Sequence, residues 1–234
     1  MNTMVLNDGT VIPTVGFGGL SDPQTTAPPT GAVRQALEIG YRHIDTAAYY
    51  RNEASVGQAL RASGLPREAV FLTSKVWNTD RGYAPTKAAF QATLDRLGTD
   101  YLDLYLIHWP AAANQFDDWE AINRAHLAGH DGALPGGVRS GPSACATSCR
   151  TACWIYATTP RFTTDRTRSS VIPTTSGRRN CPLMKELNVQ RRHGTLREGL
   201  KGMFTEPVLL EIARKHSKSR PRSSSAGTYS RASS

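Results

Sequence analysis

Short apolar runs alternate with helical stripes along residues 1–124. Apolar residues at spacings of three and four predict helices that begin near Thr30, Glu53 and Pro85. Short apolar runs bounded by turn residues predict strands, and these cover residues 15–18, 41–45, 69–76 and 101–107. A β-hairpin precedes them, because apolar runs flank the turn sequence Asn7-Asp8-Gly9. A strand and a helix therefore alternate at a spacing of roughly 30 residues.

Each predicted helix has its own apolar face. Thr30 is expected to cap the first helix, and Gly98 to end the third. The apolar faces comprise Val33, Ala36 and Leu37 in the first helix, Val56, Ala59 and Leu60 in the second, and Phe90, Leu94 and Leu97 in the third.

Strands that are joined by helices are expected to be parallel. The pattern allows either a doubly wound sheet or a (β/α)8 barrel. The G-x-G-x-x-G fingerprint typical of dinucleotide-binding doubly wound sheets is missing, since residues 16–19 read GFGG. A lone glycine cluster is weak evidence, so the pattern by itself leaves both architectures open.

The apolar periodicity stops near residue 125. Residues 125–193 are dominated by Arg, Ser, Thr, Gly and Pro, and such a composition buries too little surface to offset the ordering of the chain. We expect this segment to be irregular. Periodicity returns over residues 194–218 and is lost again over residues 219–234, which we expect to be a disordered tail. Within 194–218 a helix starting at Pro207 is predicted, with an apolar side formed by Val208, Leu209, Ile212 and Ala213.

The basic charge follows the same division. The formal net charge is +9, but residues 1–124 hold 10 Lys and Arg against 13 Asp and Glu. Residues 125–193 hold 10 against 3. A nucleic-acid partner is therefore an interpretation for the middle segment only. That segment has few aromatic residues for base stacking and contains no known nucleic-acid-binding module, so the interpretation is disfavoured.

The cysteines also lie in the middle segment, at Cys145, Cys149, Cys153 and Cys181. Structural zinc sites usually show two close C-x₂₋₄-C pairs, which these spacings do not give, and we expect no metal. The start MNTMVLNDGTVIP lacks the features of a secretory signal, and no apolar run approaches the ~20 residues of a membrane span. We expect a cytoplasmic chain without a membrane partner, in which disulfides do not form.

Polar residues stand where the predicted strands end. Asp45, Lys75 and His108 each lie at the end of a strand, and Tyr50 lies just beyond the second strand. Each alone has an ordinary interpretation, such as a helix cap or a solvated charge. In a parallel barrel, however, the strand ends meet at the face that carries the chemistry. His43, by contrast, is expected to pack within its strand.

The four residues suit the reduction of a carbonyl group. Hydride attack places negative charge on the carbonyl oxygen, so the site needs a proton donor. An ammonium on Lys75 would lower the pKa of the Tyr50 phenol from its ordinary value near 10. Asp45 would keep Lys75 charged and in place, and His108 would orient the carbonyl by a hydrogen bond.

Three stretches then resemble the aldo-keto reductase family. They are residues 40–57 (GYRHIDTAAYYRNEASVG), 71–77 (FLTSKVW) and 101–110 (YLDLYLIHWP), and the resemblance extends almost continuously over residues 1–124. It is closest to the bacterial diketogluconate-reductase branch. It implies a (β/α)8 barrel of the TIM type that reduces aldehydes or ketones with NADPH.

The resemblance also implies a role for individual residues. Tyr50 would be the general acid, Lys75 and Asp45 would tune it, and His108 would orient the substrate. Trp77 and Trp109 would line the substrate pocket. The cofactor would be approached by Gly18, Gly19, Leu20 and Asp45, although Leu20 replaces an aromatic residue that the family often has.

The family's later cofactor-binding motifs are not found in residues 125–193. Residues 202–219 (GMFTEPVLLEIARKHSKS) nevertheless resemble a late family segment at about the expected distance. Preserved spacing with foreign content indicates that residues 125–193 and 219–234 are translated out of frame. An incomplete barrel has open strand edges, which favour aggregation, so we expect a poorly soluble chain or one with impaired activity. If the chain folds, we expect a monomer. The alternatives are a non-catalytic fragment or a basic nucleic-acid-binding protein.

Overall fold

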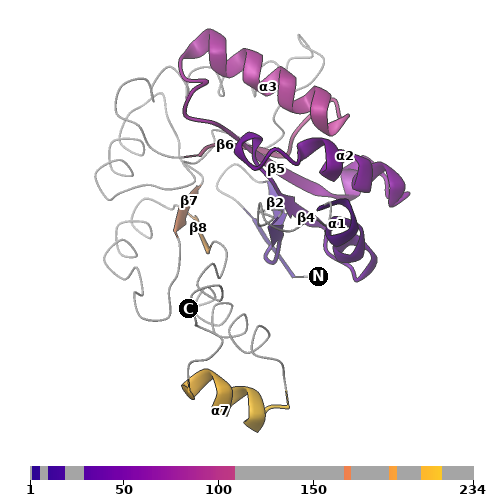
Figure 1. Cartoon of the computed structure of the whole chain (residues 1–234), viewed down its shortest axis with the longest axis vertical. Coiled ribbons are helices and arrows are strands. Elements are labelled where there is room, and N and C mark those ends of the chain that lie inside the picture. The colour runs from indigo at the N-terminus through magenta and orange to yellow at the C-terminus, as the bar shows by residue number, and fades with distance from the viewer. Residues whose placement is uncertain are drawn as a thin grey trace.

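The computed structural model describes residues 2–5, 10–18, 29–108, 166–169, 190–193 and 207–217 (Figure 1). The strands are β1 (Thr3–Val5), β2 (Val11–Pro13), β3 (Phe17–Gly18), β4 (His43–Asp45), β5 (Phe71–Val76), β6 (Leu104–Ile107), β7 (Arg166–Ser169) and β8 (Gln190–His193). The helices are α1 (Pro29–Glu38), α2 (Glu53–Ala62), α3 (Tyr83–Leu97) and α7 (Pro207–Lys215), with short 3₁₀ turns η1 (Ala48–Tyr50) and η2 (Arg67–Ala69).

The central sheet has the order β3-β4-β5-β6, and every neighbouring pair in it is parallel. The strands are thus laid down in chain order, without the reversal that defines a doubly wound sheet. All three crossover helices lie on one side of this sheet (Figure 1). The described part of the chain therefore has the arrangement of consecutive βα units in a (β/α)8 barrel.

The main core lies between the sheet and these helices. It contains Val33 and Leu37 of α1, Val56 and Ala59 of α2, and the three predicted apolar residues of α3. The predicted helix faces are confirmed. Gly98 ends α3 with a left-handed φ of 65° and donates its N–H to the Leu94 carbonyl, as expected. The cap predicted at Thr30 is wrong, because α1 begins one residue earlier at Pro29, a residue that suits the first turn of a helix.

The other side of the sheet is covered by the predicted hairpin, β1 paired with β2. Ile12 and Met4 pack against the inward-facing Phe71, Leu104 and Leu106. These contacts hold the hairpin against strands β5 and β6.

His43 fastens the same hairpin to the sheet. Its buried ring lies 3.4 Å from the Pro13 carbonyl oxygen through Nδ1 and 3.1 Å from the Thr73 hydroxyl through Nε2. The backbone of Gly16 packs against this ring so closely that a Cβ there would lie 2.9 Å from Nδ1. The prediction that His43 packs within the structure is confirmed.

A polar network ties the start of β5 to the start of β6. The Arg67 guanidinium donates to the Asp103 carboxylate at 2.8 Å and to the Tyr101 carbonyl at 3.0 Å. Asp103 Oδ2 also accepts the Leu72 N–H at 2.9 Å. Arg67 further donates to the Val70 carbonyl at 2.6 Å, and its guanidinium lies 4.1 Å from the centre of the Tyr101 ring.

Two strands lie within the segment that was expected to be irregular. β7 and β8 are paired in parallel, with Thr167 opposite Arg191 and Arg168 opposite Arg192. Both strands consist of polar residues, so apolar periodicity gives no signal for them. The helix predicted from Pro207 is confirmed as α7, but Val208 and Ile212 on its apolar side are exposed and only Ala213 is buried among the residues described there.

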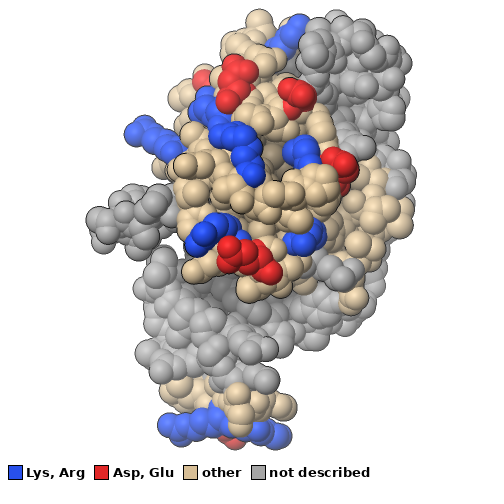
Figure 2. Space-filling view, turned by 90° about the vertical axis from the view of Figure 1, so that its right-hand side faces the viewer, with Lys and Arg blue, Asp and Glu red and all other residues tan. Residues whose placement is uncertain are grey.

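Lys, Arg, Asp and Glu side chains are interspersed on the face shown in Figure 2. Charges of both signs are mixed on the upper part of this view, and the separate body at its lower end shows mainly Lys and Arg. Among the described residues, no helix is long and apolar enough to cross a membrane. The four cysteines lie outside the described residues.

Candidate active site

Three neighbouring strands bring polar residues to one edge of the sheet. Asp45 is the last residue of β4, Lys75 lies one residue before the end of β5, and His108 directly follows β6. The backbone N–H of His108 donates to the Val76 carbonyl at 3.2 Å, which continues the ladder between β5 and β6. Because the strands are parallel, their carboxyl ends lie together, as the sequence predicts.

Lys75 and Asp45 form a buried ion pair. The ammonium of Lys75 is 2.6 Å from Asp45 Oδ1, and the two side chains are 0% and 2% exposed. The ammonium also donates to the Thr46 carbonyl at 2.6 Å. Buried charges persist only when they are paired and hydrogen-bonded, and both conditions are met here. The pair fixes the Lys75 amino group at the sheet edge.

Tyr50 lies beside this charge. It is the last residue of η1, and its ring centre is 4.9 Å from the Lys75 ammonium. The ring also meets His108 edge to face, with centres 5.5 Å apart and planes at 86°. The structure thus brings together Asp45, Tyr50, Lys75 and His108, which the sequence places as far as 63 positions apart.

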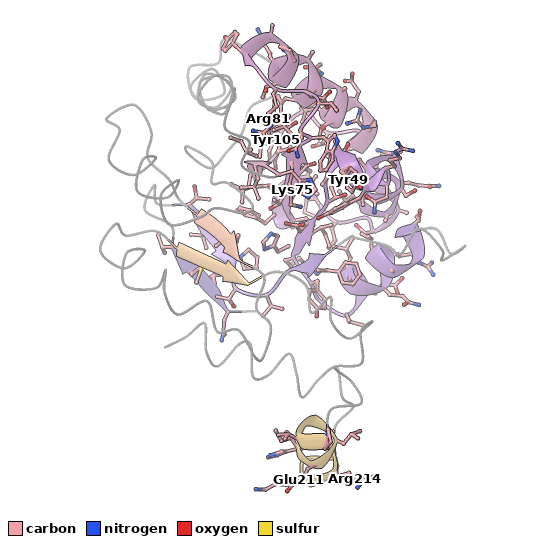
Figure 3. The ribbon with its side chains drawn as sticks, turned by 60° about the vertical axis from the view of Figure 1, so that its left-hand side comes forward. Tyr49, Lys75, Arg81, Tyr105, Glu211 and Arg214 are labelled. Carbon is pink, nitrogen blue, oxygen red and sulfur yellow. The ribbon has the colours of Figure 1, made fainter. Side chains whose placement is uncertain are left out.

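Aromatic residues surround the His108 ring. Trp77, which follows β5, lies edge-on to it at 5.2 Å, and Tyr49 stacks on Trp77 with ring centres 3.9 Å apart. Tyr49 and Lys75 are labelled in Figure 3, where they come from η1 and β5, two elements that are in contact. Trp77 thus lies beside the cluster, and its role in lining a substrate pocket stays a prediction. Tyr49 was missed, although the adjacent pair of tyrosines in the sequence was a possible signal.

A groove of about 450 Å³ adjoins Tyr49 and Trp77. Its remaining lining residues are Ala48, Arg51, Glu53, Ala54, Asp80 and Arg96. The groove is therefore bounded by charged as well as aromatic side chains. Tyr50, Lys75 and His108 do not line it, so it lies next to the cluster of four and is distinct from it.

Behind the cluster lies a buried carboxylate that sequence reasoning missed. Glu53, the first residue of α2, is 1% exposed and accepts the Ser74 hydroxyl at 2.5 Å and the Arg96 guanidinium at 2.7 Å. Tyr105 of β6 is also buried in this region. Burial raises the pKa of its phenol far above the ordinary value, and the charge of Glu53 acts in the same direction.

The predicted cofactor residues are only partly described. Gly18 ends β3 and stands opposite Asp45 in the register of β3 and β4, so these two predicted residues are neighbours. Gly19, Leu20 and Trp109 lie outside the described residues. No group of three or more His, Cys, Asp or Glu residues able to hold a metal occurs in the described part of the chain.

Comparison with known proteins finds the family that the sequence motifs resemble. Residues 14–130 match the model of the aldo/keto reductase family. An aldo-keto reductase of Mycolicibacterium smegmatis is 55% identical over 127 residues, which are 53% of this chain and 44% of that protein. Glyoxal reductase of Bacillus subtilis is 45% identical over 128 residues, or 55% of this chain and 46% of that enzyme. The chain thus matches less than half of the length of these relatives.

Solved structures extend the likeness to the fold. The aldo/keto reductase of Brucella melitensis superposes with a TM-score of 0.81 at 32% identity, covering 94% of this chain and 80% of that one. An aldo-keto reductase of Bombyx mori, solved in complex with NADP, superposes with a TM-score of 0.80 at 27% identity, covering 94% and 77%. Residues 14–130 match the family model, and the parallel strands of the sheet follow one another in chain order. The chain therefore belongs to the aldo/keto reductase family.

Proposed function

We propose that this chain reduces an aldehyde or ketone to an alcohol with NADPH, and that Tyr50 gives the proton. The observation that carries the proposal is the position of the Tyr50 ring, 4.9 Å from an ammonium that is itself fixed by a buried carboxylate. A phenol is a poor acid at neutral pH unless its anion is stabilised. The Lys75 ammonium provides that stabilisation, because an opposite charge at this distance favours the phenolate.

Each of the other residues supports the proton transfer. Asp45 keeps Lys75 protonated and directs it, since the pair is 2.6 Å apart in a buried setting. His108 lies 5.5 Å from Tyr50 between ring centres, a position from which it hydrogen-bonds a carbonyl oxygen held beside the phenol. Trp77 and Trp109 line the substrate pocket in this proposal, and Tyr49, which stacks on Trp77, lines it as well.

NADPH is the proposed hydride donor. Support comes from Gly18, which has no side chain and stands opposite Asp45 in the register of β3 and β4 at the sheet edge that carries the cluster. Gly19 and Leu20 continue this edge in the proposal. The Bombyx mori relative, solved in complex with NADP, supports this choice. When bound, NADPH supplies the hydride, and Tyr50 supplies the proton to the resulting alkoxide.

A small carbonyl compound is the proposed substrate. Support comes from the relative named glyoxal reductase. We further propose that the chain acts in the cytoplasm as a monomer, without a nucleic-acid or membrane partner. Its turnover is impaired in this proposal, because the family's later cofactor-binding motifs are not found in residues 125–193.

The test is the oxidation of NADPH in the presence of glyoxal, followed at 340 nm. We expect slow turnover that falls about 10²- to 10⁴-fold in Tyr50→Phe, since a general acid contributes a factor of that size. Tyr83→Phe is the matched control, because Tyr83 is half-exposed at the start of α3, and it should turn over like the unmodified chain. Turnover that is unchanged in Tyr50→Phe would contradict the proposal. Turnover as fast as that of the Bacillus relative would contradict only the impairment.

A further inference from the structure

A closed ring of buried hydrogen bonds surrounds the segment that carries Tyr50. The Lys75 ammonium donates to the Thr46 carbonyl, and the Thr46 hydroxyl donates to Asn52 Oδ1 at 2.8 Å. Asn52 is joined by a peptide bond to Glu53, whose carboxylate accepts the Ser74 hydroxyl. Ser74 is joined by a peptide bond to Lys75, which closes the ring. We call these five residues the 46–75 ring.

All five members of the ring are at least nine-tenths buried. Thr46, Ser74 and Lys75 are each 0% exposed, Glu53 is 1% exposed and Asn52 is 4% exposed. Hydrogen bonds in such a setting are shielded from competition with water, and each broken one leaves a desolvated polar group. We therefore expect that opening the ring costs free energy.

Asn52 is used in an unusual way. It occupies the N-cap position of α2, where an asparagine side chain normally accepts a backbone N–H of the first turn and contributes about 1 kcal/mol. Here its side chain makes no cap hydrogen bond. The oxygen accepts the Thr46 hydroxyl instead. The Asn52 side chain therefore closes the loop of residues 46–52 and does not cap α2.

That loop contains Tyr50. Within it the Tyr50 N–H donates to the Ala47 carbonyl at 3.0 Å, and Arg51 turns the chain back towards α2 with a left-handed φ of 53°. A left-handed conformation is unfavourable for arginine and persists only where the surroundings impose it. The bond between Thr46 and Asn52 joins the two ends of the loop and so imposes this path.

The second half of the ring fixes Lys75 from the opposite side. In a strand, neighbouring side chains point to opposite faces. Lys75 points to Asp45, whereas Ser74 points towards the helices and meets Glu53. Glu53 is held in turn by Arg96 of α3 at 2.7 Å. The start of α2 thus restrains both the loop of Tyr50 and the strand of Lys75.

We propose that Thr46, Asn52, Glu53 and Ser74 are positioning residues that set the distance between the Tyr50 phenol and the Lys75 ammonium. The proposal rests on the proposed function, but it concerns residues that touch neither substrate nor cofactor. Among the described residues, charged or titratable groups that contact the Tyr50 ring include Lys75, which is paired with Asp45, and His108. Opening the ring should let the loop move away from the ammonium.

Thr46→Val tests this, because it removes the hydroxyl, keeps the shape and leaves the carbonyl that Lys75 binds. The titration of Tyr50 is read as the difference in phenolate absorbance near 295 nm between each protein and the same protein with Tyr50→Phe added. We expect Thr46→Val to move this titration to higher pH by about one unit, since an opposite charge at 4–6 Å accounts for about 1–3 units. NADPH-dependent kcat should fall about ten- to a hundredfold with little change in KM, because misplacement of a reacting group has an effect of that size.

Two controls separate positioning from a general loss of stability. Thr46→Ser keeps the hydroxyl and should restore the titration and kcat. Thr86→Val removes a buried hydroxyl that donates to the Asp80 carbonyl at 3.0 Å, outside the ring. It should lower the thermal midpoint about as much as Thr46→Val and leave the Tyr50 titration unchanged. If Thr46→Val does not fold, Ser74→Ala, which opens the other half of the ring, is read in the same way.

The outcomes are distinguishable. Suppose that the unmodified chain turns over, and that neither Thr46→Val nor Ser74→Ala changes the Tyr50 titration or kcat. This result would overturn the ring proposal and leave the proposed function standing. A chain without turnover in which Thr46→Val still shifts the titration would overturn the proposed function and support the ring. Equal shifts in Thr86→Val would overturn the ring proposal.

Discussion

Gly57 of α2 packs directly against the backbone of Leu97 at the end of α3. A Cβ on Gly57 would overlap the carbonyl oxygen of Leu97, so only glycine allows the two helices to approach this closely. The same two helices are linked by the ion pair between Glu53 and Arg96. The close approach therefore determines where Glu53 meets Ser74, and with it the position of the strand that carries Lys75.

Gly57→Ala is expected to lower the free energy of unfolding by about 1–3 kcal/mol or more, because overpacking forces the helices apart. Gly31→Ala is the matched control, since nothing lies within 4 Å of a Cβ at this position in α1. It should raise stability by about 0.5–1 kcal/mol, because glycine is unfavourable inside a helix. Urea unfolding of both variants checks the pair. Equal effects of the two substitutions would contradict the argument.

Removing one partner of the buried ion pair should lower the free energy of unfolding. Lys75→Met leaves the Asp45 carboxylate buried without its partner at 2.6 Å, and we expect a loss of about 3–5 kcal/mol. Adding Asp45→Asn removes the remaining charge and should recover part of this loss. Denaturant unfolding of the two single variants and the double variant measures the coupling. A double variant as unstable as the sum of the single ones would show that the pair contributes no coupling.

Gly16→Ala should loosen the hairpin, because the new methyl group meets the His43 ring at 2.9 Å. We expect a loss of about 1–3 kcal/mol, with faster amide exchange at Ile12 in β2. His43→Ala makes room for the methyl group. In that background Gly16→Ala should therefore lower the free energy of unfolding by less. Strictly additive effects of Gly16→Ala and His43→Ala would refute the contact as the cause.

The chain should lose stability in alkaline solution through Tyr105. Burial raises the pKa of its phenol in the folded state, whereas the unfolded chain releases the proton near pH 10. Above that pH the unfolded state binds fewer protons, so unfolding becomes easier by up to about 1.4 kcal/mol per pH unit. Tyr105→Phe should flatten this decline while changing stability at pH 7 by about 1 kcal/mol. An alkaline decline of the same slope in Tyr105→Phe would assign it to other groups.

The sequence predicts most of the described sheet and the cluster at its edge. Short apolar runs identify β4, β5 and β6, in which every residue is buried. Apolar periodicity identifies the helices between them, because each helix buries one face. The ends of these strands then place Asp45, Lys75 and His108 at one edge, and the ion pair between the first two is found there. Strand boundaries were predicted less well, since β6 begins at Leu104, three residues later than expected.

The remaining features depend on tertiary contacts that no local pattern encodes. Ser74 and Glu53 are polar residues in a strand and at a helix start, where solvent exposure is the ordinary expectation, yet both are buried against each other. Tyr49 of η1 stacks on an aromatic ring only because the fold brings Trp77, which follows β5, next to it. β7 and β8 consist of polar residues, so pairing of their backbones is not signalled by hydropathy.

The coding DNA should explain the composition of residues 125–193 and 219–234. We propose that these segments are read out of frame, so another frame across codons 125–193 is expected to encode the missing cofactor-binding motifs. Resequencing codons 120–234 and translating all three frames checks this. A chain expressed from the repaired frame should oxidise NADPH faster than the present one. If no frame gives family-like sequence, the segment is genuine and the proposal is wrong.

The network around Arg67 lies at the opposite end of the strands from the candidate active site. By engaging Asp103 and Tyr101, and through Asp103 the N–H of Leu72, it fixes how β6 is aligned with β5. A slip of one residue would turn every side chain of β6 to the other face and carry His108 out of place. Arg67 therefore helps to set the strand register on which the active site depends. A substitution of Arg67 is expected to lower catalytic activity although the residue lies far from the site.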